Sequence, residues 1–186
     1  TQRFDDALRE AFRYHSDQSR KGDAAVPYMG HLLGVTSIVI DAGGTEDQVI
    51  AALLHDAPED QGGEVTLEEI RVKFGDNVAG IVKDLSDTFD DPKPPWKQRK
   101  MEYLADLKTV SDSTLLVSLA DKLHNVQSIT LDREQVGEKV WERFTGKREG
   151  SLWYYRALGE IYGKRMTDSP LLRRYLEIVD QLEMAG

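Results

Sequence analysis

The spacing of the apolar residues constrains the fold of this chain most strongly. Apolar side chains recur at three- and four-residue intervals along nearly all of the 186 residues, and sustained alternation with a period of two is hard to find. The first spacing places apolar side chains on one face of an α-helix, whereas the strands of a half-buried sheet need the second. The sequence therefore predicts an all-α fold.

The same spacing locates the helices. We expect them at residues 3–19, 28–42, 46–58, 67–74, 76–88, 95–110, 113–131, 151–166 and 170–184. Thr66 and Glu69 have the spacing of a capping box, and Ser169 followed by Pro170 is typical of a helix start. The stretch 90–95 is expected to be a loop, because its prolines lack a backbone donor and disfavour helix in the preceding residue.

Length and charge limit the classes of protein that fit. A chain of this length suits one domain with its own core, and neither a repeat nor a low-complexity linker divides it. Without a membrane-length apolar stretch or a recognisable leader, a cytoplasmic protein is expected, with no membrane partner. The net charge of −9 argues against a broad nucleic-acid surface, because phosphates attract positive charge. Basic residues cluster locally at 20–21, 97–100 and 147–148, and each cluster alone is typical of a solvated helix face.

Titratable side chains interrupt apolar segments at three places. An apolar run ends in His55 and Asp56, His31 lies within a second apolar helix, and Asp121 lies beside the apolar stripe of a third. A carboxylate buried without a partner costs several kcal/mol, roughly, so these positions need a cation or hydrogen bonds. A lone histidine in such a helix is more often a packing residue than a ligand. Together, however, the four side chains form a ligand set.

Two imidazoles and two carboxylates from three helices would hold one divalent ion and leave positions for water. The chain has no cysteine, so any metal here must be bound through nitrogen and oxygen. Manganese, iron, zinc and magnesium accept such ligands, and manganese or another borderline ion suits two imidazoles better than magnesium does. The metal would neutralise Asp56 and Asp121, acidify a bound water and polarise a phosphoryl oxygen.

Three segments carry a resemblance to a known family: HSDQSRKGDAAVPYMGH (15–31), HDAPED (55–60) and LADKLHN (119–125). Together they resemble the HD phosphohydrolase superfamily, and in particular the stand-alone small alarmone hydrolases of the Rel/Spo type. The resemblance implies an HD-domain helical bundle, with a motif-bearing core over about 3–131 and C-terminal helices over about 132–186 of a single domain. It also implies a manganese-dependent enzyme that removes the 3′-diphosphate of (p)ppGpp- or (p)ppApp-type alarmones.

The resemblance assigns roles to residues at the matching positions. It implies that His31, His55, Asp56 and Asp121 are the metal ligands, and that Glu59 and Asp60 handle the attacking water and its proton. The substrate contacts that it implies are Arg20, Lys21, Asn125, Lys97 and Arg99. The chain departs from the family pattern at Asp17, at Leu32 and at Ala57-Pro58, and none of these departures removes a ligand.

Aromatic and basic residues follow in the segment 146–165, beyond the resemblance. Arg148, Trp153, Tyr154, Tyr155 and Arg156 can wall a nucleotide pocket by stacking and phosphate contact. The alternative is an amphipathic helix that caps the core. From this segment we single out Arg148 as a substrate contact.

Two other functions are compatible with the metal ligands. A nucleotidase acting on ordinary nucleotides would need the ligands, but neither the basic pair Arg20 and Lys21 nor the acidic pair Glu59 and Asp60. A non-catalytic nucleotide sensor can lose a ligand or the acidic pair, and this chain retains all of them. The alarmone hydrolase is therefore the interpretation that we favour. The sequence leaves open the base preference, the oligomeric state and a cognate alarmone synthetase as a genetic partner.

Overall fold

A computed structural model describes residues 1–22, 26–90 and 92–184, and this part of the chain forms helices and no strand. The all-α prediction is confirmed. The helices are α1 Gln2–His15, α2 Met29–Asp41, α3 Glu46–Leu54, α4 Ala57–Asp60, α5 Glu64–Phe74, α6 Asp76–Leu85, α7 Trp96–Asp106, α8 Asp112–Val136, α9 Lys147–Arg165 and α10 Pro170–Met184, with a 3₁₀ helix η1 at Gly137–Arg143.

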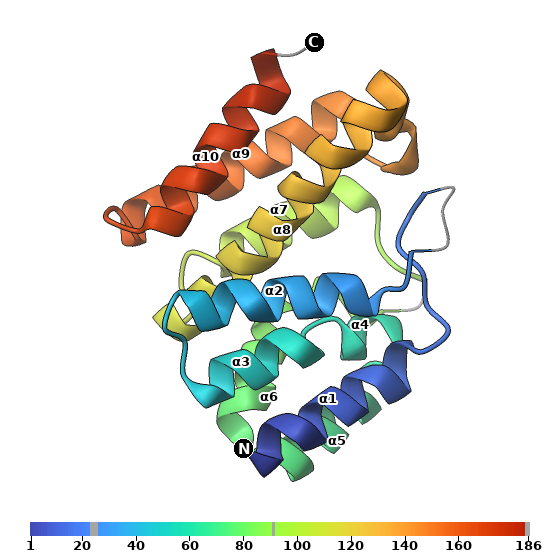
Figure 1. Ribbon diagram of the computed structural model, residues 1–186, viewed down its shortest axis with the longest axis vertical. Helices are drawn as coiled ribbons and strands as arrows, with labels where there is room; N and C mark the ends of the chain where they lie inside the picture. The colour runs from blue at the N-terminus through green and yellow to red at the C-terminus, as the bar shows by residue number, and fades with distance from the viewer. Residues whose placement is uncertain (23–25, 91, 185–186) are drawn as a thin grey trace.

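The long helix α8 lies between α2 on one side and α10 on the other (Figure 1), and it packs into two apolar clusters. Val117 and Ala120 pack into the first cluster, with residues of α1, α2, α3, α5 and α6. Leu115, Leu119 and Leu123 pack into the second, with residues of α7, η1, α9 and α10. Asp121 is flanked by Ala120 of the first cluster and by Leu119 and Leu123 of the second, so this buried carboxylate lies where the two clusters meet, at a boundary that we call the seam.

Pro58 divides the helix predicted over 46–58 into two, and the turn at the division contains two of the predicted metal ligands. Pro58 occupies the first turn of α4, where its missing N–H costs nothing, whereas inside a continuous helix it would remove a hydrogen bond. As a result α3 ends at Leu54 and α4 begins at Ala57. His55 and Asp56 are the two residues of the turn between these helices.

Other predicted boundaries also shift. The Thr66–Glu69 capping box is wrong, because α5 begins earlier, after Gly62 and Gly63 with φ of 116° and 62°. The Thr66 hydroxyl instead donates to the Gln61 carbonyl at 2.5 Å. Helix α8 continues to Val136 and α9 begins at Lys147, so both are longer than predicted.

The helix start at Ser169 is confirmed, since the Leu172 amide donates to its hydroxyl at 3.4 Å. The described part of the loop 90–95 is also free of helix, and α7 begins at Trp96, whereas Asp91 lies outside the described residues.

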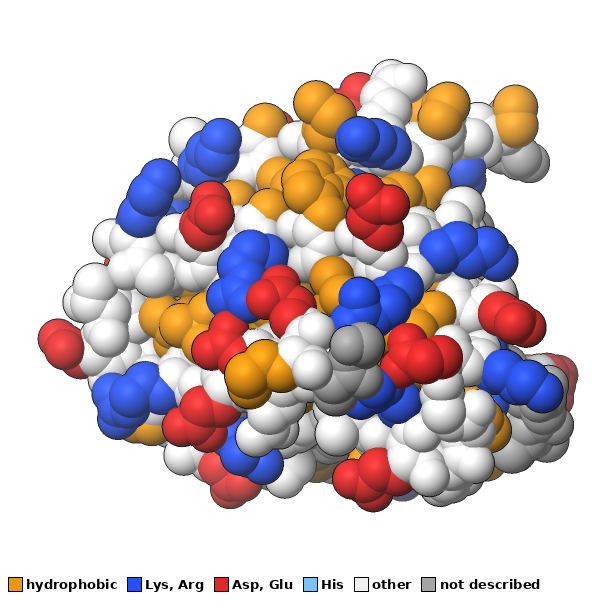
Figure 2. All heavy atoms as spheres, turned by 90° about the horizontal axis from the view of Figure 1, so that it is seen from above, with side chains coloured by type: hydrophobic (Ala, Val, Ile, Leu, Met, Phe, Trp, Pro, Cys, Tyr) orange, Lys and Arg blue, Asp and Glu red, His pale blue; other side chains and the backbone are white. Residues whose placement is uncertain are grey.

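The surface shows charges of both signs. On the face seen from above, lysine and arginine side chains alternate with acidic and hydrophobic ones and form no broad basic field (Figure 2). Among the described residues, no helix combines the length and apolar character that crossing a membrane requires.

Candidate metal centre and active site

The four predicted ligands come together from three places in the chain. His31 lies on α2, His55 and Asp56 lie in the turn between α3 and α4, and Asp121 lies on α8. His31 Nε2 is 3.2 Å from Asp121 Oδ1 and 3.6 Å from Asp56 Oδ2. His55 Nε2 is 3.0 Å from Asp56 Oδ2 and 3.7 Å from Asp121 Oδ1. Each imidazole therefore faces both carboxylates.

These separations fit one divalent ion. Nitrogen and oxygen ligands lie about 2.0–2.2 Å from such an ion, so neighbouring ligand atoms around it are about 3–3.5 Å apart. The donor atoms of His31, His55 and Asp56 all lie within 4.8 Å of one another, and Asp121 Oδ1 is near both imidazoles. We call these four residues the metal cluster.

The orientation of His55 supports the same fit. Its Nδ1 is 2.8 Å from the Ala52 carbonyl oxygen, which can only accept, so Nδ1 donates. Its Nε2 is buried without a hydrogen bond and faces two carboxylate oxygens. Opposite two carboxylates, this nitrogen needs either a proton of its own or a bound cation, and a metal ion meets that need.

The electrostatics of the metal cluster favour positive charge. Burial alone would raise the pKa of Asp56 and Asp121. The neighbouring histidines hold the pKa of Asp56 well below the usual range, and Lys122, followed by the histidines, does so for Asp121. Burial opposes charge on His55, yet the two carboxylates raise its pKa well above the usual value. A buried site that keeps its carboxylates ionised is suited to a cation.

Hydrogen bonds from a further layer of side chains fix the two carboxylates. The Tyr28 hydroxyl donates to Asp56 Oδ2 at 2.5 Å. Asn125 Nδ2 and Lys122 Nζ each donate to one oxygen of Asp121, both at 2.6 Å. Such contacts orient ligands and tune their basicity. Tyr28 and Lys122 were not predicted, although both lie within the motifs, because the sequence does not show which neighbours of a ligand turn inward.

The two acidic residues of α4, Glu59 and Asp60, form hydrogen bonds with two different loops. Asp60 Oδ2 accepts from Gln18 Nε2 at 2.7 Å, and Gln18 Oε1 lies 2.6 Å from His15 Nδ1. Burial and the nearby Asp56 raise the pKa of Asp60. Glu59 accepts from the Asp87 amide at 3.1 Å and pairs with Lys93 at 3.0 Å. The pair therefore borders the metal cluster without replacing any of its ligands.

Basic residues connect to the metal cluster from the loop after α1. Arg20 donates to Asn125 Oδ1 at 3.1 Å, and Asn125 holds Asp121, so this arginine is two contacts away from a ligand. Lys21 is exposed beside it. Arg143 of η1, which was not predicted, lies against the same loop: a Cβ on Gly22, whose φ is +145°, would be 3.1 Å from its guanidinium carbon.

The basic residues of α7 are tied to neighbouring elements. Arg99 pairs with Asp87 and donates to the Pro94 carbonyl at 3.0 Å, and the Lys97 ammonium lies 5.7 Å from the centre of the Trp153 ring. Lys100, which we did not single out from the sequence, bonds Asp87 at 3.1 Å. Burial, and then repulsion from the Lys122 ammonium, lower the pKa of Lys100 to about 7.

The segment 146–165 packs as a helix on the second apolar cluster. Tyr154 and Tyr155 are buried there, and Arg156 pairs with acidic residues of α10. Arg148 donates to the carbonyls of Leu182 and Glu183, at 3.4 and 3.0 Å. Those contacts support the alternative of a helix that caps the core, and the role of Arg148 as a substrate contact stays a prediction.

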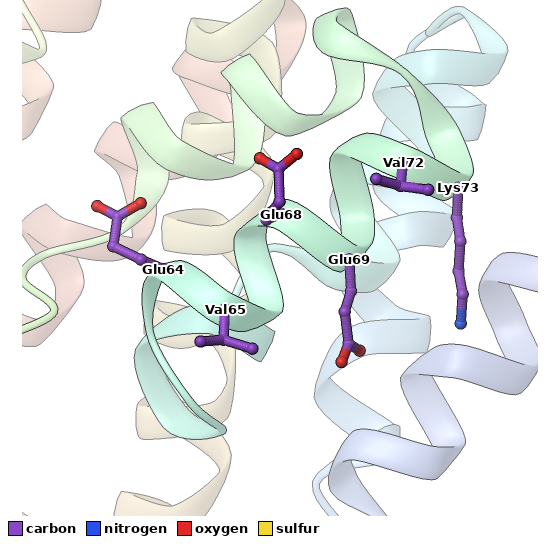
Figure 3. Close-up of a pocket in the computed structure, with 6 residues that line it drawn as sticks. All are labelled: Glu64, Val65, Glu68, Glu69, Val72 and Lys73. Atoms are coloured by element: carbon purple, nitrogen blue, oxygen red, sulfur yellow. The ribbon is translucent and has the colours of Figure 1, made fainter.

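An open groove lies elsewhere, along α5 (Figure 3). Its lining residues are Glu64, Val65, Glu68, Glu69, Val72 and Lys73, and none belongs to the metal cluster. The predicted ligands therefore lie outside this groove.

Comparison with known proteins identifies the family. A model of the HD domain matches residues 7–152, which include all four residues of the metal cluster. The chain belongs to the HD-domain family. The resemblance to the stand-alone alarmone hydrolases is confirmed as well. The chain is 38% identical over 126 residues to the guanosine-3′,5′-bis(diphosphate) 3′-pyrophosphohydrolase MESH1 of Xenopus tropicalis, covering 67% of this chain and 68% of that protein.

Further relatives agree with this placement among HD-domain proteins. The human MESH1 protein is 36% identical over 121 residues, which is 64% of this chain and 65% of the relative. The solved structure of a metazoan SpoT ortholog that hydrolyses ppGpp superimposes with a TM-score of 0.80 at 26% identity, covering 97% of this chain and 96% of the other. A Listeria monocytogenes structure matches with a TM-score of 0.71 at 29% identity, over 82% and 97%.

Proposed function

We propose that this protein hydrolyses the 3′-diphosphate of a guanosine or adenosine alarmone and releases pyrophosphate and a 5′-nucleotide. The observation that carries the proposal is the metal cluster, in which two imidazoles and two ionised carboxylates face one another within 3.0–3.7 Å. The relatives provide the substrate, since MESH1 is named for hydrolysis of guanosine-3′,5′-bis(diphosphate). We assign Mn²⁺ to the site, because it accepts mixed imidazole and carboxylate ligands.

The residues of the chain would act as follows. His31, His55, Asp56 and Asp121 would hold the ion, which when bound supplies Lewis-acid activation of water and phosphoryl oxygens. In the reaction, the oxygen of water bonds to the phosphorus next to the ribose, the bond from this phosphorus to the 3′ oxygen breaks, and that oxygen gains a proton. Asp60, whose pKa burial raises, and Glu59 beside it would take the proton of the water and return one to the leaving oxygen.

The remaining contacts would select the substrate. Arg20 and Lys21 would neutralise phosphates, and Asn125 would contact the ribose or its phosphates. Through its bond to Asn125, Arg20 places positive charge close to the metal cluster in a chain of net charge −9, which a polyanionic substrate needs. Lys97, Arg99 and Arg148 complete the proposed contacts.

A substrate panel tests the proposal directly. Manganese-loaded protein is incubated with ppGpp, ppApp, GTP, GDP and AMP, and the products are separated by anion-exchange chromatography. We expect pyrophosphate and GDP from ppGpp, or pyrophosphate and ADP from ppApp, and no comparable turnover of the mononucleotides. Turnover of GTP or AMP at similar rates would favour the general nucleotidase, and tight binding of ppGpp without turnover would favour the sensor.

The basic pair should affect the alarmone more than a simple substrate. Arg20→Ala and Lys21→Ala are each expected to raise KM for the alarmone by about 10- to 100-fold, because a charged hydrogen bond is worth roughly 1.5–3 kcal/mol. Turnover of a simple phosphate ester such as p-nitrophenyl phosphate should change little, since the ester has no further phosphates to bind. Arg9→Ala, on an exposed face of α1, is the matched control. Equal losses on both substrates would instead indicate a structural role.

A further inference from the structure

The Nδ1 atom of His31, the ring nitrogen that does not face the carboxylates, has another histidine as its hydrogen-bond partner. His31 Nδ1 lies 2.9 Å from His124 Nδ1, with the ring centres 4.9 Å apart and the planes inclined by 57°. At this distance one nitrogen carries the proton and the other accepts it. The other proposed ligand histidine, His55, bonds the Ala52 carbonyl instead, and this acceptor lies on α3, directly before the turn that contains His55.

The direction of the His31–His124 bond follows from the metal cluster. His31 Nε2 faces Asp56 and Asp121, and a metal ligand must present a lone pair there. A neutral imidazole with a lone pair on Nε2 has its proton on Nδ1. The Nδ1 of His124 is then the acceptor, and the proton of His124 lies on its Nε2.

Space for the His124 ring exists because residue 34 is glycine. Gly34 follows His31 by one turn of α2, and a Cβ there would lie 2.2 Å from His124 Nε2 and 2.3 Å from His124 Cδ2. Atoms do not approach this closely, so any other residue would displace the ring. Glycine is a poor helix former, and its φ here is not positive, so the helix itself gives no reason for it. Gly30, one turn earlier on α2, would meet nothing within 4 Å.

We propose that His124 is a positioning residue for the metal centre, which accepts a hydrogen bond from His31 Nδ1 and so directs His31 Nε2 to the ion, and that Gly34 provides the space for it. This inference rests on the proposed metal site. Under this proposal, three residues of one turn of α8 serve the metal site. Asp121 is a ligand, Asn125 donates a hydrogen bond to Asp121, and His124 orients His31 of α2. Residues three and four apart lie on one helix face, which brings the three side chains to the same seam.

Two pairs of variants separate this role from packing. His124→Asn keeps an acceptor atom close to the position of Nδ1, whereas His124→Leu fills similar space without one. Gly34→Ala forces the ring away, whereas Gly30→Ala adds the same methyl group to the same helix in open space. Urea denaturation of all four variants establishes that each is folded before it is assayed.

Manganese affinity is the first readout, measured by electron paramagnetic resonance of free Mn²⁺ during titration. We expect His124→Leu and Gly34→Ala to raise the Kd by about 10- to 100-fold, the usual effect of removing the partner of a ligand histidine. His124→Asn and Gly30→Ala should bind nearly as the parent chain does. The second readout is ¹⁵N NMR of the histidine rings in the Zn²⁺ form, in which His31 should carry its proton on Nδ1 in the parent chain and in His124→Asn.

The outcomes distinguish this inference from the proposed function. If the parent chain binds Mn²⁺ and His124→Leu binds it equally well with an unchanged His31 tautomer, the positioning role is wrong and the metal site stands. If the parent chain binds no divalent ion, both proposals are wrong. Should Gly34→Ala fail to fold, the comparison of His124→Asn with His124→Leu still decides the question.

Discussion

Asp121→Ala and Asp121→Asn are expected to abolish Mn²⁺ binding and alarmone hydrolysis together. Asp121 Oδ1 lies 3.2 and 3.7 Å from the two imidazole nitrogens of the metal cluster. It is also the only one of the four predicted ligands that lies on α8, so without it the ion would have no ligand from this helix. The alanine variant removes a carboxylate from a buried pair as well, because Lys122 bonds the same side chain at 2.6 Å.

That buried pair makes the choice of variant important. Leaving a buried charge without its partner costs about 3–5 kcal/mol, so Asp121→Ala is expected to be less stable than the parent chain by an amount in this range. Asp121→Asn keeps the size of the side chain and one oxygen that accepts from Asn125 or Lys122, and it loses the charge and the second acceptor. If Asp121→Asn is folded and lacks metal, the loss of activity comes from the ligand and not from unfolding.

Three measurements on the same preparations test this expectation. Metal content by mass spectrometry should fall from about one ion per chain to a trace, and pyrophosphate release should fall to background. Mn²⁺ should raise the unfolding free energy of the parent chain by about 2.7 kcal/mol at 100 times its Kd, and it should not stabilise Asp121→Asn. Asp180→Ala, an exposed partner of Arg156, is the matched control. Normal metal content in Asp121→Asn would exclude Asp121 from the ligand set.

The proximity of His31, His55, Asp56 and Asp121 could be predicted because each of them interrupts or borders an apolar segment of the sequence. A histidine or aspartate inside an apolar run is visible without knowledge of the fold, and the cost of burying it predicts a shared partner. Tyr28 and His124 differ from these residues. An aromatic residue or a histidine has many ordinary roles, and only the tertiary packing shows that Tyr28 contacts Asp56 and that His124 of α8 contacts His31 of α2.

The helix boundaries show the same limit. The spacing of apolar residues gave every long helix, because it records which face is buried. It missed the break before Pro58, since the apolar run continues up to Leu54 and the following Ala57 and Pro58 are buried as well. It also missed the 3₁₀ helix at 137–143, which begins where Gly137 adopts a φ of 63° and ends α8. Local backbone conformation of this kind is decided by tertiary packing as much as by sequence.

Glu59→Gln and Asp60→Asn are each expected to lower kcat while metal and substrate affinity are retained. Both residues stand on α4, beyond the turn that holds His55 and Asp56, and both bond to loops and not to the metal cluster. Removing a general acid or base costs roughly 10²- to 10⁴-fold in rate, so we expect a fall in this range. For Asp60, burial beside Asp56 raises the pKa and thereby adapts a carboxyl group to proton transfer.

Metal content, alarmone Kd and the single-turnover rate of these two variants decide their role. Loss of metal would make the acids ligands, and a higher Kd at an unchanged rate would make them binding residues. Gln18→Ala provides a graded control, because Gln18 donates to Asp60 at 2.7 Å without carrying a proton that can be transferred. It should lower the rate less than Asp60→Asn does, since the carboxyl group remains while its position loosens. An unchanged rate in both acid variants would favour the sensor or the general nucleotidase instead. A fall in rate with normal binding would establish the pair as the proton-transfer groups of the hydrolase.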